Sequence, residues 1–157
     1  RSIADRSLEL ASDPRVPFVV PAPKRPVPYL NFAPLENAVA RLRASARLFD
    51  EQEQRASAPL PLNARKQLDQ LFIQCDRALL RPEGLPRRPW YKHVIYAPGY
   101  YTGYDVKTIP GVREAIEEFR WDDASVQIPI AAGALAAMAD QIDKATALIR
   151  YFESPAK

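Results

Sequence analysis

One stretch of the 157-residue chain, from Gly84 to Gly111, limits what the whole can fold into. Its four prolines each lack an amide donor and restrict the preceding residue, so no long helix can form there. The stretch also holds four of the five glycines and six aromatic residues: Trp90, Tyr91, Tyr96, Tyr100, Tyr101 and Tyr104. Disordered segments are poor in aromatic residues. The sequence therefore predicts a long ordered loop packed on a scaffold, and loops of this length are usually functional.

Hydrophobic periodicity predicts the scaffold around this loop. Apolar residues recur at three- and four-residue spacing over 34–56 and 62–80, and again in a short segment that starts at Pro110. A last helix is expected over 123–152, kinked at Pro129, because its apolar stripe runs unbroken across that proline. Asn63 and either Asp122 or Asp123 are expected to cap helices. The predicted fold is all-α, an up-and-down bundle of about four helices with no strand pattern.

The chain is expected to divide into two parts. Residues 1–33 are predicted to form a short helix, over 1–12, and a proline-rich arm of extended backbone. Residues 34–157 form the helical domain, with the long loop between its second and third helices. The small residues of 131–139 fit a central or interfacial helix, with a candidate contact face around Ala134 and Ala137. Because the chain begins with Arg1 rather than Met, we expect a processed product or a piece of a longer protein.

The composition offers no catalytic apparatus within this chain. A hydrolytic zinc site needs three or four ligands brought together, and the chain has one histidine and one cysteine. We therefore assign no catalytic residue, no metal ligand and no cofactor to it. Cys75 lies on an apolar stripe and is interpreted as a buried hydrophobic residue. A net charge of only +3 argues against nucleic acid as a partner, and no apolar run suggests membrane contact.

The run LPRRPWYKHVIYAP, followed by IPG, resembles the transferrin receptor-like dimerisation domain of the glutamate carboxypeptidase II and transferrin receptor family. The resemblance extends more weakly from about Phe32 to about Ala145. It implies the same helical architecture and a non-catalytic domain excised from a zinc-dependent peptidase. The implied partners are a second copy, as a homodimer, and the protease domain of the parent chain, where the zinc is expected. The family also suggests an extracytoplasmic or secreted location.

In that family a loop of this domain completes the substrate pocket of the protease domain, and the resemblance places it at about 96–108. Glutamate-specific members carry a Lys-Tyr pair there, which holds the carboxylate of the C-terminal glutamate. Alignment of YAP and IPG puts the tyrosine at Tyr104 and leaves Gly103 at the lysine position. The missing ammonium predicts a preference for another C-terminal residue, or a broad one. The substrate-binding candidates are Tyr104, Tyr101, Tyr100 and Lys107, with Lys107 as a substitute cation.

The residues of the loop also have alternative interpretations as purely structural groups. The tyrosines can pack the loop without touching a ligand. His93 is expected to bond loop backbone while Val94 and Ile95 anchor into the bundle. Arg87 and Arg88 are interpreted as solvated or paired with helix-end carbonyls, and Trp90 and Tyr91 as side chains that fix the loop to the scaffold. The alternative function is a stand-alone or receptor-like interaction module without peptidase activity. Zinc ligands in neighbouring sequence would distinguish the two functions.

Overall fold

The computed structural model describes residues 15, 26–56 and 58–153. The predicted helix over 1–12 and most of the proline-rich arm lie outside the described residues, so the division at residue 33 stays a prediction. The described chain contains the helices α1 (Ala33–Arg55), α2 (Leu62–Arg77), α3 (Pro110–Glu117) and α4 (Trp121–Glu153). Two short strands, β1 (Tyr96–Pro98) and β2 (Val106–Thr108), pair between α2 and α3. The mostly helical fold is confirmed, whereas the hairpin was not predicted.

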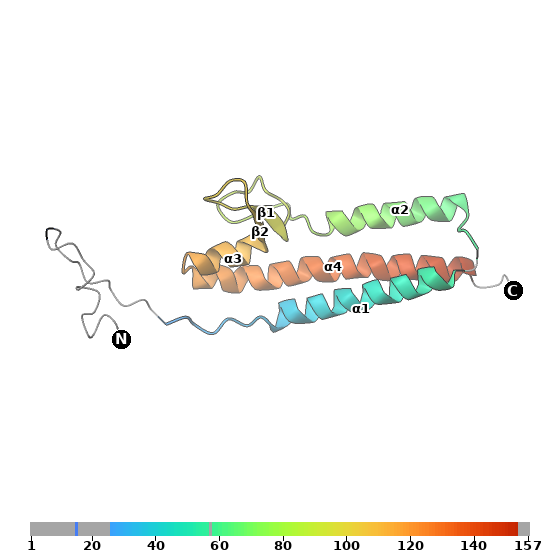
Figure 1. Ribbon diagram of the computed structural model, residues 1–157, viewed down its shortest axis with the longest axis horizontal. Coiled ribbons are helices and arrows are strands. Elements are labelled where there is room, and N and C mark those ends of the chain that lie inside the picture. The colour runs from blue at the N-terminus through green and yellow to red at the C-terminus, as the bar shows by residue number, and fades with distance from the viewer. Residues whose placement is uncertain (1–14, 16–25, 57, 154–157) are drawn as a thin grey trace.

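Helix α4 is the central element. Helices α1 and α2 lie along two sides of α4. Helix α2 runs antiparallel to both α1 and α4, so the long helices follow the predicted up-and-down order (Figure 1). Phe49 of α1 meets Phe72 of α2 edge-to-face, with ring centroids 5.6 Å apart. The short helix α3 packs on the beginning of α4 and carries the hairpin at that end (Figure 1). The long loop is thus held at one end of the helical layer.

The small residues of α4 explain its central place. Ala139 and Ala145 have no exposed surface, because the flanking helices approach the α4 backbone closely. Pro129 lies inside α4, as predicted, and the helix continues on both sides of it. The capping predictions were wrong. Helix α4 begins at Trp121, so both aspartates lie in its first turn, and the residue that precedes α2 is Pro61. Carboxylates in a first turn are still favourable, because the helix dipole is positive there.

The main hydrophobic core lies where α1, α3 and the first half of α4 meet. Its buried members are Leu35, Ala38, Val112, Ile128, Ala131, Ala132 and Leu135. Ile95 and Ile109, at the two feet of the hairpin, pack against this core. The core therefore serves both the helices and the base of the loop.

Candidate functional site

The site proposed from the sequence is a hairpin with a wide tip. Strands β1 and β2 are antiparallel, and Ala97 lies opposite Lys107. We call the connecting residues 99–105 the tip loop. The amide of Gly99 donates to the Asp105 carbonyl at 2.8 Å, and the amide of Gly103 donates to the Gly99 carbonyl at 2.9 Å. Gly103 has a φ of +73°, a left-handed conformation that glycine adopts without steric cost. These bonds give the tip loop a defined backbone.

Both feet of the hairpin are anchored. The Val94 amide donates to the Leu79 carbonyl at 3.0 Å, and the Val94 side chain is buried. On the other side, the Ile109 amide donates to the Ile95 carbonyl at 2.6 Å. Ile109 has a φ of +48°, which is strained for a β-branched residue, and this turn sends the chain from β2 into α3. The predicted anchoring by Val94 and Ile95 is confirmed.

His93 is a structural residue of the first foot. Its Nδ1 accepts hydrogen bonds from the amides of Ile95 and Tyr96, both at 3.2 Å. Its ring lies against that of Tyr96, with centroids 3.8 Å apart and planes tilted by 37°. The Nε2 atom is buried without a partner in the described residues. Burial lowers the pKa of His93, against an opposing effect from Asp76. The prediction that His93 bonds loop backbone is confirmed.

A buried ion pair lies beneath the tip loop. The Nη2 atom of Arg88 donates to Oε1 of Glu114 at 2.6 Å, and the two side chains are 4% and 7% exposed. The same Oε1 accepts the Tyr100 amide at 2.8 Å, while Nη1 of Arg88 donates to the Pro98 carbonyl. Arg88 was interpreted as solvated or paired with helix-end carbonyls, and both interpretations were wrong. The carbonyl that it does bond ends strand β1.

Two further ion pairs, less buried than the first, join the loop to α3 and to Glu118 at its C-terminal end. Arg87 pairs with Glu118 at 2.6 Å and covers the Tyr100 ring, 4.2 Å from its centroid. The pKa of Arg87 is raised, chiefly by its hydrogen bond to Glu118 and then by one to Tyr101. Lys107 pairs with Glu117 and lowers the pKa of that carboxyl. The loop is therefore held to α3, and to Glu118 directly after it, by three cations on three carboxylates.

The tyrosines of the tip loop face outward to different degrees. Tyr104 is 90% exposed and Tyr101 is 77% exposed, whereas Tyr100 is 40% exposed beneath the two arginines. Trp90 is 69% exposed, so the expectation that it fixes the loop to the scaffold was wrong. The structure thus leaves phenol groups at the surface of an otherwise fixed loop. A phenol hydroxyl can donate a hydrogen bond to a carboxylate.

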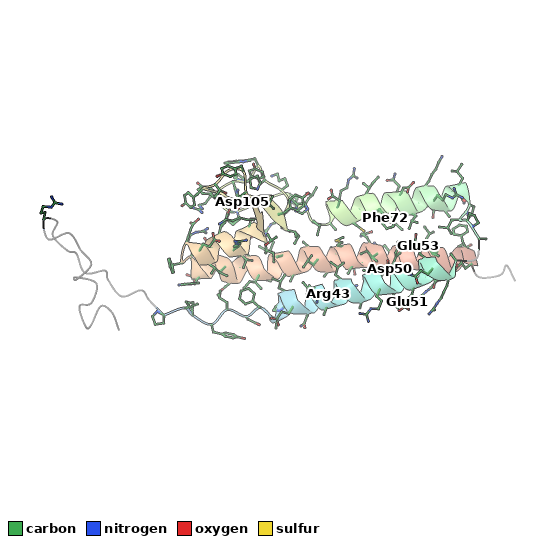
Figure 2. The ribbon with its side chains drawn as sticks, viewed as in Figure 1. Arg43, Asp50, Glu51, Glu53, Phe72 and Asp105 are labelled. Carbon is green, nitrogen blue, oxygen red and sulfur yellow. The ribbon has the colours of Figure 1, made fainter. Side chains whose placement is uncertain are left out.

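Within the part of the chain that the structure describes, no three His, Cys, Asp or Glu residues gather in a way that could hold a metal ion. Figure 2 shows Asp105 in the loop, far from Asp50, Glu51 and Glu53 of α1. Cys75 is buried as predicted, and burial raises the pKa of its thiol. Among the described helices, none has the length and apolar character to cross a bilayer.

The residues that sequence reasoning missed are Arg88, as a buried group, and Glu114. Two adjacent arginines between prolines suggest a solvated surface, and the partner carboxylate lies 26 residues further along the chain. Nothing in the spacing of these residues indicates that they meet.

Comparison with known proteins agrees with this arrangement. The profile of the transferrin receptor-like dimerisation domain matches residues 30–143. The chain therefore belongs to that family, and it carries a dimerisation domain. The match covers α1, α2, the whole long loop, α3 and most of α4.

Three relatives show the proteins in which such a domain occurs. A probable glutamate carboxypeptidase of Arabidopsis thaliana is 37% identical over 70 residues, 40% of this chain. One from Arthroderma benhamiae is 32% identical over 91 residues, 57% of this chain. An aminopeptidase of Rattus norvegicus is 30% identical over 129 residues, 76% of this chain. The chain spans only 10%, 12% and 17% of the lengths of these relatives.

Proposed function

We propose that this chain is the dimerisation domain of a zinc-dependent peptidase, and that its tip loop completes the substrate pocket of the protease domain. The observation that carries the proposal is a loop of fixed backbone that presents exposed phenols. Family membership and the peptidase names of the relatives support it. The zinc would be bound by the protease domain, since the described residues of this chain offer no ligand set. This domain's own part is to bind and orient substrate.

Within the pocket, Tyr104 and Tyr101 are the proposed contacts to substrate. Both project from the tip loop, and the Tyr104 hydroxyl is proposed to donate to the C-terminal carboxylate of a peptide. Tyr100 is the third candidate, although its ring already lies against Arg87 and Arg88. Lys107 is the fourth. Its ammonium is held by Glu117, so a substrate carboxylate would have to compete with that side chain.

Gly103 sets the proposed specificity. A β-carbon built at this position would meet nothing within 4 Å, so space for a side chain exists. Without a cation there, we expect the full-length enzyme to prefer a C-terminal residue other than glutamate, or to be broad. The ratio of kcat/KM for glutamate and leucine substrates measures this. Strong selectivity for glutamate would contradict it, and Gly103→Lys is expected to shift the ratio toward glutamate.

Self-association is proposed to use helix α2. Only a narrow stripe of α2 is covered by the rest of the chain, and Leu62 and Ile73 remain 69% and 44% exposed. A groove of about 460 Å³ runs along the same helix, lined by Lys66, Gln67, Gln70, Leu71 and Gln74. Exposed apolar patches with polar rims are typical of interaction sites. A second copy packed on this face would form a two-fold symmetric dimer.

Light scattering over a dilution series tests the association. We expect a dimer at micromolar concentration that Ile73→Arg converts to monomer without loss of helical circular dichroism. Gly133→Arg is the matched control, because Gly133 is exposed on α4 with open space around it. If Gly133→Arg dissociates the dimer and Ile73→Arg does not, the interface lies on the small-residue face of α4, within 131–139, and not on α2. A wild-type monomer at every concentration would contradict self-association by this chain.

A receptor-like module without peptidase activity is the alternative. Translation of the coding sequence on both sides of this segment separates the two proposals. A neighbouring domain with His, Asp and Glu zinc ligands, together with hydrolysis of peptides, supports the peptidase. Neighbouring sequence that lacks those ligands would overturn it and favour the interaction module.

A further inference from the structure

The Glu114 carboxylate occupies an unusual position for a charged group. It lies on α3, outside the tip loop, and is almost fully buried. A single oxygen of this carboxylate receives the Arg88 guanidinium at 2.6 Å and the Tyr100 amide at 2.8 Å. Arg88 in turn donates to the carbonyl of Pro98. The backbone on both sides of Gly99 is therefore held by one buried ion pair.

Stability alone does not account for this pair. Removal of two charges from water costs several kcal/mol for each ion, and the attraction between them only roughly repays that cost. Apolar side chains of similar volume often stabilise a protein equally well. What an apolar pair cannot supply is an acceptor for the Tyr100 amide and a donor for the Pro98 carbonyl. The charged pair therefore gives a defined path to the chain as it enters the tip loop.

We propose that Glu114 and Arg88 are positioning residues of the tip loop. They fix the backbone at Pro98 and Tyr100, and so set the direction in which Tyr101 and Tyr104 leave the scaffold. The consequence for substrate rests on the proposed function of the loop, whereas the positioning itself does not. Arg87 and Lys107 reinforce this arrangement from the exposed side through Glu118 and Glu117.

The double variant Arg88→Met/Glu114→Leu tests the positioning, because it removes both charges together and leaves no buried unpaired ion. Amide exchange of the 157-residue chain is measured by NMR, together with its thermal midpoint. We expect the midpoint to stay within a few degrees, while the amides of Tyr100 and Gly103 exchange at least about tenfold faster. The amides of α4 around Ala139 should be unchanged.

Two results of this experiment would overturn the positioning proposal. Unchanged exchange at Tyr100 would overturn the proposal, because the loop would then keep its order without the pair. Loss of the folded state would also overturn it, since the pair would be a requirement of the fold. The double variant Arg88→Met/Glu114→Gln retains an oxygen acceptor without leaving Arg88 buried and unpaired, and it is expected to restore most of the protection at Tyr100. Arg41→Met, which breaks the two distant ion pairs of Arg41 in α1 with Asp140 and Asp143 in α4, should leave Tyr100 exchange unchanged.

The same double variant in the full-length enzyme separates the inference from the proposed function. If the tip loop orients substrate, kcat/KM should fall at least tenfold, mainly through KM, with the fold retained. Faster exchange at Tyr100 with unchanged kinetics would leave the positioning intact and contradict the role of the loop in the pocket.

Discussion

Different interactions stabilise the helical layer and the long loop. In the layer, α1 and α3 bury apolar side chains against α4, and the most buried positions are alanine, valine, isoleucine and leucine. In the loop, backbone hydrogen bonds, His93 and the three ion pairs to α3 and Glu118 add to the burial of Val94 at its base, while Trp90, Tyr101 and Tyr104 remain exposed. The core between α1, α3 and α4 buries its apolar side chains, whereas the loop leaves these three aromatic side chains exposed.

This difference indicates how a small domain can present a precise but open contact surface. Apolar packing would have to bury the aromatic rings in order to use them for stability. Polar anchors at the base leave those rings available to a partner. The layer supplies the stability, and the anchors transmit its rigidity to the tip loop.

The largest expected effect belongs to the core. Ile128 is 1% exposed, so Ile128→Ala removes buried methyl groups and leaves a cavity. We expect a loss of about 2–5 kcal/mol in the free energy of unfolding, measured with urea. Val126→Ala is the control on the same helix, since Val126 is 57% exposed and its truncation should cost less than about 0.5 kcal/mol. Equal losses in the two variants would show that Ile128 does not lie in the hydrophobic core.

A pair of glycines distinguishes the crowded base of the loop from its open tip. Gly84 and Gly103 have φ values of +71° and +73°, so alanine is strained to a similar extent at both positions. At Gly84 the added carbon would lie 2.3 Å from the Pro89 carbonyl oxygen, whereas at Gly103 it would meet nothing. We expect Gly103→Ala to cost about 1 kcal/mol and Gly84→Ala clearly more, by urea unfolding. Similar costs would contradict the open tip.

The smallest expected effect is the pH dependence of the anchor at His93, the chain's only histidine. Burial lowers its pKa in the folded state below the ordinary value of 6.5. Folding therefore favours the neutral ring, whose Nδ1 accepts the two amides. This stabilisation is present above pH 6.5 and is lost as the pH falls below it.

Urea unfolding of wild type and His93→Gln at several pH values checks this dependence. Glutamine does not titrate, so the stability difference between the two proteins should shrink as the pH is lowered from about 7.5 to 5.5. The carboxylates of the chain are common to both proteins and cancel in the comparison. A stability difference that does not change with pH would show that His93 has the same pKa in the folded and unfolded states.

The sequence was a good guide where local periodicity decides the structure. The stripes through Leu35 and Ala64 located α1 and α2 to within a few residues, and Pro110 marked the start of α3. The hairpin was missed because each strand has three residues and β1 contains Pro98, which gives no alternating pattern. The run Trp121-Asp122-Asp123 was interpreted as a break before the last helix, with either aspartate as its cap, because aspartate is favoured at helix N-caps. In the structure these residues form the first turn of α4.

The candidate site was predictable only in part. The four prolines, four glycines and six aromatic residues of 84–111 identified the loop, and His93 was given its correct structural role. The buried contact of Arg88 with Glu114 depends on how α3 folds back beneath the tip loop, which local patterns do not encode. The exposure of Trp90 likewise depends on tertiary contacts that the loop does not make in this chain.

The most direct test of the account is the variant Tyr104→Phe in the proposed full-length peptidase, assayed on peptides with free C-terminal carboxylates. It removes one hydroxyl from a side chain that is 90% exposed in this domain, so the thermal midpoint should not change. A hydrogen bond to a charged group contributes about 1.5–3 kcal/mol, so kcat/KM should fall roughly 10- to 150-fold. Unchanged kcat/KM would show that the hydroxyl does not bind substrate, and would contradict the proposal that this loop completes the pocket.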